Sequence, residues 1–121
     1  MDLEALLKDL RNVKGYMASG IATSAGEVIA RDIAAPSLNL TLITALTNDV
    51  MLQAHEVGQK YSGTVTEETM IHATKGSVLI RCTGAEAKAH LHVTCVLGAD
   101  GNVSLARVLM KKIAAAAADA L

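Results

Sequence analysis

The spacing of apolar residues along the chain predicts three helices. Leucines recur three and four residues apart near the start, with charged residues between them, which predicts a helix over residues 2–13. The longest periodic segment predicts a second helix over 38–60. Apolar and charged positions follow the same period over 103–120, which predicts a third helix close to the end of the chain.

Short runs rich in β-branched residues, separated by turn residues, predict five strands. Two of them flank Ala25-Gly26 and form a first hairpin. Three more follow the second helix and are joined by tight turns at Lys75-Gly76-Ser77 and Gly84-Ala85-Glu86, so they are antiparallel. The expected strand segments are "YMASGIATS", "VIARD", "VTEETMIHAT", "SVLIRCT" and "AKAHLHVTCVLG".

These elements give the order αββαβββα over residues 1–121, which is the length of one ordinary domain. The economical arrangement is an α+β fold, in which helices flank one five-stranded antiparallel sheet. Pro36 separates the first hairpin from the second helix, and Ser37 or Asn39 is the expected cap of that helix.

The second helix has more apolar surface than one sheet can cover. On a helical wheel one apolar stripe is expected to face the sheet, and a second apolar side lies away from it. A second subunit packed on that far side would cover it, with Asp49 setting the register or marking the edge. The expected core stripe consists of Ile43, Leu46, Val50, Ala54 and Val57. The expected dimer interface on this helix consists of Leu38, Leu42, Ala45, Asp49 and Leu52.

The segment "LGADGNVSLARVLMKK" over 97–112 is a candidate binding loop, because glycine and aspartate residues are followed by basic residues. It lacks the glycine spacing of a dinucleotide fingerprint, the GKS or GKT of a phosphate loop and the ligand spacing of a calcium loop. We therefore interpret it as a turn in which Asn102 or Ser104 caps the third helix. Arg107 and Lys111 lie on the polar side of that helix, and they are candidates for binding an acidic partner.

Composition excludes several classes of partner. Half of the residues are hydrophobic (51%), but only 2% are aromatic and the net charge is −1, so neither base stacking nor a basic footprint for nucleic acid is expected. The acidic start is not a signal peptide, and the apolar runs are too short to span a bilayer. Cys82 and Cys95 show no metal spacing and are expected to be buried thiols, which favours a cytoplasmic protein.

The histidines are the main candidates for a metal site. His90 and His92 are two residues apart on one strand and share a face, and with His72 they would bind zinc if the three rings converged. Cys95 is an odd number of residues from His90 and His92 on the same strand, so it points to the other face of the sheet. No carboxylate lies near these histidines in the sequence to support a ligand. We expect no metal site, and half-exposed strand histidines instead.

No catalytic site or cofactor is expected either. There is no GxSxG motif and no cysteine–histidine pair on an evident elbow. Glu67 and Glu68 are adjacent on a strand, so they point to opposite faces and cannot share a substrate.

In its order of elements the chain resembles the Roadblock (dynein light-chain) family. The resemblance covers nearly the whole chain and is carried by "VKGYMASGIATSAGEVIA", "MIHATKGSVLIRCTG" and "NVSLARVLMKKI". The chain departs from the family pattern at Ala25-Gly26, where the family has an Asp-Gly turn, and at Tyr16.

The resemblance implies a non-enzymatic homodimer that binds a small Ras-like GTPase, or serves as a light chain of a dynein-type motor. It also implies that the second helices and the third strands pair between subunits, which adds Thr69 and Ile71 to the expected interface. The alternative is a small-molecule sensor with a plastic, methionine-containing pocket, because sensory domains also combine such sheets with flanking helices.

Overall fold

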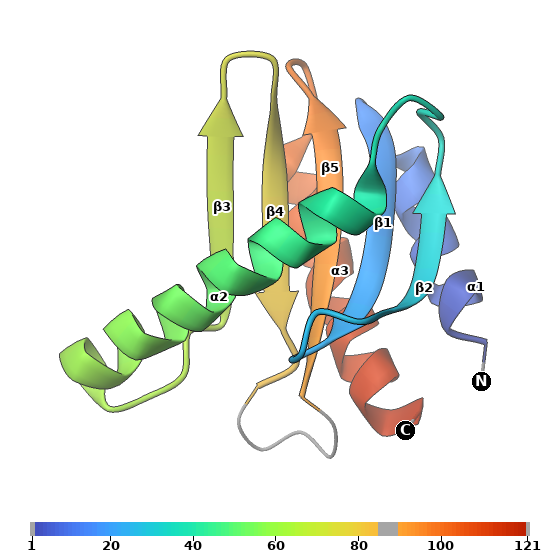
Figure 1. Cartoon of the computed structure of the whole chain (residues 1–121). Coiled ribbons are helices and arrows are strands. Elements are labelled where there is room, and N and C mark those ends of the chain that lie inside the picture. The colour runs from blue at the N-terminus through green and yellow to red at the C-terminus, as the bar shows by residue number, and fades with distance from the viewer. Residues whose placement is uncertain (1, 85–89, 121) are drawn as a thin grey trace.

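The computed structural model describes residues 2–84 and 90–120, and it has a five-stranded sheet between two layers of helices (Figure 1). Helix α2 crosses the front of the sheet, and α1 and α3 lie behind it. This is the predicted α+β fold with the predicted order of helices and strands. The elements are α1 (Leu3–Leu7), η1 (Lys8–Asn12), β1 (Tyr16–Thr23), β2 (Val28–Ile33), α2 (Leu40–Ser62), β3 (Glu68–Ala73), β4 (Gly76–Cys82), β5 (Leu91–Gly98) and α3 (Val103–Ala120).

The strands lie in the order β2-β1-β5-β4-β3, and every neighbouring pair is antiparallel. Strand β5 is central and buried along almost its whole length, as expected for its run of apolar and β-branched residues. Strands β2 and β3 are the two edges. The backbone of β3 is therefore open on its outer side among the residues that the structure describes.

The caps of the two long helices confirm the sequence prediction. Asn39 Oδ1 accepts the backbone N–H of Leu42 at the start of α2, and Asn102 Oδ1 accepts that of Leu105 at the start of α3, both at 3.1 Å. Helix α2 ends at Gly63, whose φ of 73° is the left-handed conformation that glycine adopts without strain. Over 2–84 and 90–120, no helix combines the length and the apolar character needed to cross a bilayer.

Two local predictions need correction. The predicted helix over 2–13 is α-helical only as far as Leu7 and continues as the 3₁₀ helix η1, a common ending for a short helix. The predicted turn at Lys75-Gly76-Ser77 lies one residue earlier, because Ala73 pairs with Gly76 and only two residues connect β3 to β4. The predicted turn at Gly84-Ala85-Glu86 and the predicted strand start at 87 fall largely outside the described residues.

The two sides of the sheet are packed differently. On the side of α1 and α3 the core is almost wholly apolar, with Leu7 and Met110 among its fully buried side chains. On the side of α2 the buried apolar cluster is small. The rest of that layer mixes small or aliphatic residues such as Ala22 and Leu40 with a glycine and several buried polar residues. These are Gly20 on β1, Thr44, Thr47 and Asn48 on α2, and His92 and Thr94 on β5.

The predicted core stripe of α2 is therefore wrong for Leu46, Val50 and Val57, whereas Ala54 does pack against the small buried cluster. Leu46 is 56% exposed and Val57 is 66% exposed, whereas the buried side contains Thr44, Asn48 and Met51. The reason is that hydrogen bonds satisfy several of the buried polar groups. Thr47 donates to the carbonyl of Thr44, and Asn48 bonds to the β1–β2 turn, which offsets part of the cost of burying a polar side of the helix. The hydroxyl of Thr44 has no hydrogen-bond partner among the described residues.

A backbone contact at Gly15 provides a test of the fold. Gly15 has a φ of 84°, and a Cβ there would lie 2.6 Å from the Cα of Gly101. Gly63 has a similar φ of 73°, but apart from its chain neighbours no atom of the described residues lies within 4 Å of its Cβ position. We predict that Gly63→Ala lowers the free energy of unfolding by about 1 kcal/mol and that Gly15→Ala lowers it by at least about 2 kcal/mol more. Urea unfolding of both variants checks this, and equal losses would contradict the close approach.

Candidate functional site

The most prominent surface feature is an exposed apolar stripe along α2. Its side chains recur four and seven residues apart, so they lie on one side of the helix, facing away from the sheet. Each is at least 36% exposed. We call Leu42, Leu46, Val50 and Val57 the α2 stripe.

The structure places most of the predicted interface residues beside this stripe. Leu42 belongs to it and is 54% exposed, and Leu52 is 45% exposed on the neighbouring flank of the helix. Ala45 and Asp49 are exposed on the same flank, and Leu38 is half-buried just before the helix begins. Exposed apolar residues on α2 were thus predicted at Leu42 and Leu52, whereas Leu46, Val50 and Val57 are exposed and not in the core as predicted.

The outer strand β3 presents different residues to the two sides of the sheet. Thr69 contacts the sulfur of Met51 on α2, with 3.7 Å between Oγ1 and Sδ, so Thr69 and Ile71 lie on the α2 side. Glu68 and Met70 lie on the other side, where Glu68 bonds to Arg107 of α3. Ile71 is 36% exposed. The two predicted interface residues of β3 therefore share a side of the sheet with α2.

The predicted basic pair on α3 is partly engaged within the chain. Arg107 forms an ion pair with Glu68, and Arg81 binds the same carboxylate at 3.3 Å. These two guanidinium groups lower the pKa of Glu68, with the hydrogen bond from Arg107 as the largest cause. Lys111 lines the same shallow hollow as Arg107 and is exposed. Of the two predicted partner-binding residues, Lys111 is the one whose ammonium group projects without an ion pair among the described residues.

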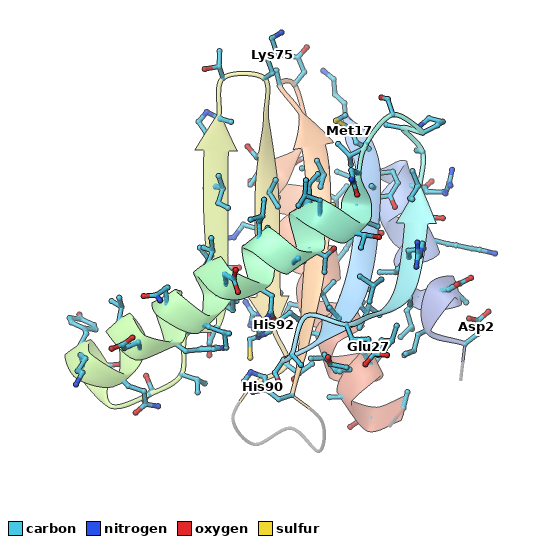
Figure 2. The ribbon with its side chains drawn as sticks, viewed as in Figure 1. Asp2, Met17, Glu27, Lys75, His90 and His92 are labelled. Atoms are coloured by element: carbon cyan, nitrogen blue, oxygen red, sulfur yellow. The ribbon has the colours of Figure 1, made fainter. Side chains whose placement is uncertain are left out.

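A second group of side chains lies on the α2 side of the sheet, near the start of β5. Figure 2 shows His90 and His92 close together there. His55 of α2 and Cys82 at the end of β4 join them, and one ligand atom from each residue lies within 4.8 Å of all the others. We call these four residues the histidine–cysteine cluster. His90 and His92 lie together, as their spacing predicts. His72 is not part of the cluster, because it lies on the other side of the sheet, with Glu68 and Met70, and pairs with Ser77 near the opposite end of β4.

The cluster is anchored by Asn48. The amide nitrogen of Asn48 donates to the carbonyl of Ser24 at 3.1 Å, which orients the amide, and its Oδ1 lies 2.8 Å from Nδ1 of His92. Burial, together with the neighbouring rings of His90 and His55, lowers the pKa of His92 to about 4. Burial also raises the pKa of Cys82 and, for Cys95 on the opposite side of the sheet, raises it to about 12.

Sequence reasoning missed His55 and Cys82 because their positions depend on tertiary structure. His55 is 35 residues from His90 along the chain, and only the crossing of α2 over the sheet brings the two within 5.2 Å between ring centroids. Cys82 pairs with His92 across β4 and β5. The pairing of β4 with β5 was the one signal in the sequence that could have located Cys82, since a correct alignment of these two strands places Cys82 opposite His92.

The buried ring of His92 predicts a pH-dependent stability. Its pKa in the folded chain lies below the ordinary value of 6.5, so the unfolded chain binds the proton more tightly. The contribution of the neutral His92 ring to the free energy of unfolding is therefore fully present above about pH 6.5. It is lost as the pH falls toward 4. We predict a loss of about 2 kcal/mol between about pH 7 and pH 5, measured by urea unfolding in a buffer with a chelator.

The exposed ring of His72 supplies the control for this pH dependence. His72→Ala is expected to keep the slope, and His92→Gln is expected to reduce it. An unchanged slope in a folded His92→Gln variant would contradict the assignment.

Comparison with known proteins bears on the fold. No protein-family model and no curated protein matches the sequence. Solved structures do match. An MglB in a tetrameric arrangement superposes with a TM-score of 0.83 at 15% identity, over 97% of this chain and 85% of the other.

Two further structures agree with this likeness. A Roadblock/LC7 domain from Streptomyces avermitilis gives a TM-score of 0.81 at 13% identity, over 96% of this chain and 94% of the other. MglC from Myxococcus xanthus gives 0.70 at 18% identity, over the full length of both chains. The chain therefore has the fold of the Roadblock/LC7 domain proteins.

Proposed function

We propose that this chain is a non-enzymatic, homodimeric interaction module that binds a small Ras-like GTPase and regulates or scaffolds it. The observation that carries the proposal is the α2 stripe, a row of four apolar side chains on a helix whose polar side is already buried. The likeness to MglB and Roadblock/LC7 structures supports the fold. The choice of partner follows from the resemblance to the Roadblock family, which implies a small Ras-like GTPase.

The dimer would use α2 and β3 together. Each side chain of the α2 stripe, once buried, contributes about 1 kcal/mol, and the stripe faces away from its own sheet. Ile71 adds apolar surface on the same side of the molecule, and the open edge of β3 offers backbone groups for pairing with a second copy. Leu42, Ala45, Asp49 and Leu52 would lie in or beside this interface, as would Leu38, where α2 begins.

The GTPase would meet a surface that the two subunits form together or the exposed part of α3. Lys111 is exposed there, beside the ion pair of Arg107 and Glu68. An exposed lysine beside a fixed arginine suits an acidic partner surface, where it would contribute more to the association rate than to affinity. The proposal assigns the chain a binding role, in which the GTPase supplies the groups that hydrolyse GTP.

The dimer is tested by one charge placed in the α2 stripe. We predict that Leu46→Glu converts the chain to a monomer, because burying an unpaired carboxylate costs about 3 kcal/mol and weakens the dimer by more than about 100-fold. The measurement is sedimentation velocity over a range of concentrations.

Val108→Glu is the matched control for this charge. Val108 is 55% exposed on α3, against 56% for Leu46 on α2, so the two substitutions differ in location rather than in exposure. The control is expected to remain dimeric. A wild-type chain that is monomeric at every concentration would overturn the proposed interface.

The partner is tested with purified proteins. Small GTPases recovered with the tagged chain from its native cells would be expressed, loaded with GDP or with a non-hydrolysable GTP analogue, and titrated into the chain by calorimetry. We predict binding that differs at least about tenfold between the two nucleotide states. Equal, absent or salt-abolished binding for all recovered GTPases would contradict the proposed partner.

A further inference from the structure

The histidine–cysteine cluster has the composition and the spacing of a metal site. Three imidazoles and one thiol face one another, and one ligand atom from each lies within 4.8 Å of the rest. In a tetrahedral zinc site, with Zn–N distances of about 2.0 Å and a Zn–S distance of about 2.3 Å, the ligand atoms lie about 3.3 to 3.5 Å apart. Small rotations of the four side chains would therefore suffice to surround an ion.

His92 already has the form that a metal ligand needs. Asn48 donates from its amide nitrogen to Ser24, so its Oδ1 must be the acceptor and Nδ1 of His92 must carry the proton. The lone pair of the neutral ring is then on Nε2. That atom is buried and has no hydrogen-bond partner among the described residues. A carbonyl that fixes the tautomer of a histidine in this way is the usual support of a ligating imidazole.

Cys82 and His90 form the second half of the cluster. Sγ of Cys82 lies 2.8 Å from Nε2 of His90 and accepts the backbone N–H of Gly84 at 3.3 Å. A backbone N–H directed at the sulfur stabilises a thiolate, which is the form that binds metal. A role as a nucleophile does not fit this sulfur, because Cys82 is only 3% exposed and burial raises its pKa.

His55 is a weaker candidate than the other three. Its Nδ1 accepts the backbone N–H of Thr66 at 3.1 Å, so the proton of the neutral ring is on Nε2. Nε2 is buried and also lacks a hydrogen-bond partner in the described parts of the chain. To bind a metal through Nε2, His55 must give up the bond from Thr66 and carry its proton on Nδ1. This cost predicts that His55 contributes least to affinity.

We propose that the histidine–cysteine cluster binds one divalent transition-metal ion of the zinc type. The thiol proton of Cys82 leaves to solvent as the Zn–S bond forms, and no redox change is involved. Imidazole and thiolate ligands favour zinc over magnesium and calcium, which require oxygen donors. With four protein ligands the site is closed, as in structural zinc sites. It joins α2 to the end of β4 and the start of β5.

The inference stands independently of the proposed function, because a monomeric chain that binds zinc would keep the metal assignment. The experiment uses the tag-free full chain, stripped of metal with a chelator and dialysed. Titration with zinc chloride is expected to give one ion per chain by calorimetry and elemental analysis, with a higher midpoint of thermal unfolding. Cobalt in place of zinc is expected to give a thiolate-to-metal charge-transfer band in the near ultraviolet.

Variants separate the proposed ligands from other histidines and thiols. Cys82→Ser is expected to abolish the charge-transfer band, and Cys82→Ser and His90→Ala are each expected to weaken zinc binding by more than about 100-fold. His55→Ala is expected to weaken it by only about tenfold. The controls are His72→Ala, an exposed histidine outside the cluster, and Cys95→Ser, the second buried thiol. Both are expected to bind zinc as the wild type does.

Several outcomes would overturn the site. These are the absence of one-to-one binding in the wild type, a charge-transfer band that survives in Cys82→Ser, or an equal loss of affinity in His90→Ala and His72→Ala. If Cys82→Ser does not fold, as judged by circular dichroism, the comparison of His90→Ala with His72→Ala decides the question alone.

Discussion

The amide of Asn48 is the contact on which the position of α2 depends. It bonds to the β1–β2 turn through Ser24 and to the central strand through His92, and it is 6% exposed. Hydrogen bonds are directional, whereas apolar contacts tolerate sliding. A helix held in this way has one preferred rotation and one preferred height on the sheet. The direction in which the α2 stripe faces follows from that rotation.

This arrangement inverts the usual pattern of a surface helix. Helix α3 buries apolar residues such as Met110 and exposes charged ones, as expected for a helix that covers one side of a sheet. Helix α2 instead buries Thr44, Thr47 and Asn48 and exposes leucine and valine. The buried polar layer is tolerated because its groups are largely bonded, and the exposed apolar layer gives the helix a second contact surface. The layer of α1 and α3 thus mainly stabilises the fold, and the layer of α2 provides a surface for association.

Most of the fold could be predicted because local signals agree with the tertiary structure. The caps at Asn39 and Asn102 and the turn residues fixed the helices and hairpins to within a few residues. The buried side of α2 could not be predicted in this way. A helical wheel ranks the sides of a helix by hydrophobicity, and it contains no information on the partners of Asn48, which are 24 and 44 residues away. The same limit applies to the histidine–cysteine cluster, whose members come from α2, β4, β5 and the residue just before β5.

Helix α2 continues past β3, so its last turns have no strand beneath them (Figure 1). Tyr61 there is 88% exposed. The segment that follows the helix folds back along it, with Thr64 bonded to Ser62 and Thr66 bonded to Ala54 and His55. Resistance to hydrogen exchange should therefore decline along α2 from Asn48 to Ser62. Gly58 steepens this gradient, because glycine disfavours the helix. Its lack of a side chain lets the following segment pack closely, since a Cβ there would lie 2.8 Å from the carbonyl oxygen of Thr64. The end of the helix is thus a segment whose order any bound molecule would increase, at an entropic cost to the affinity.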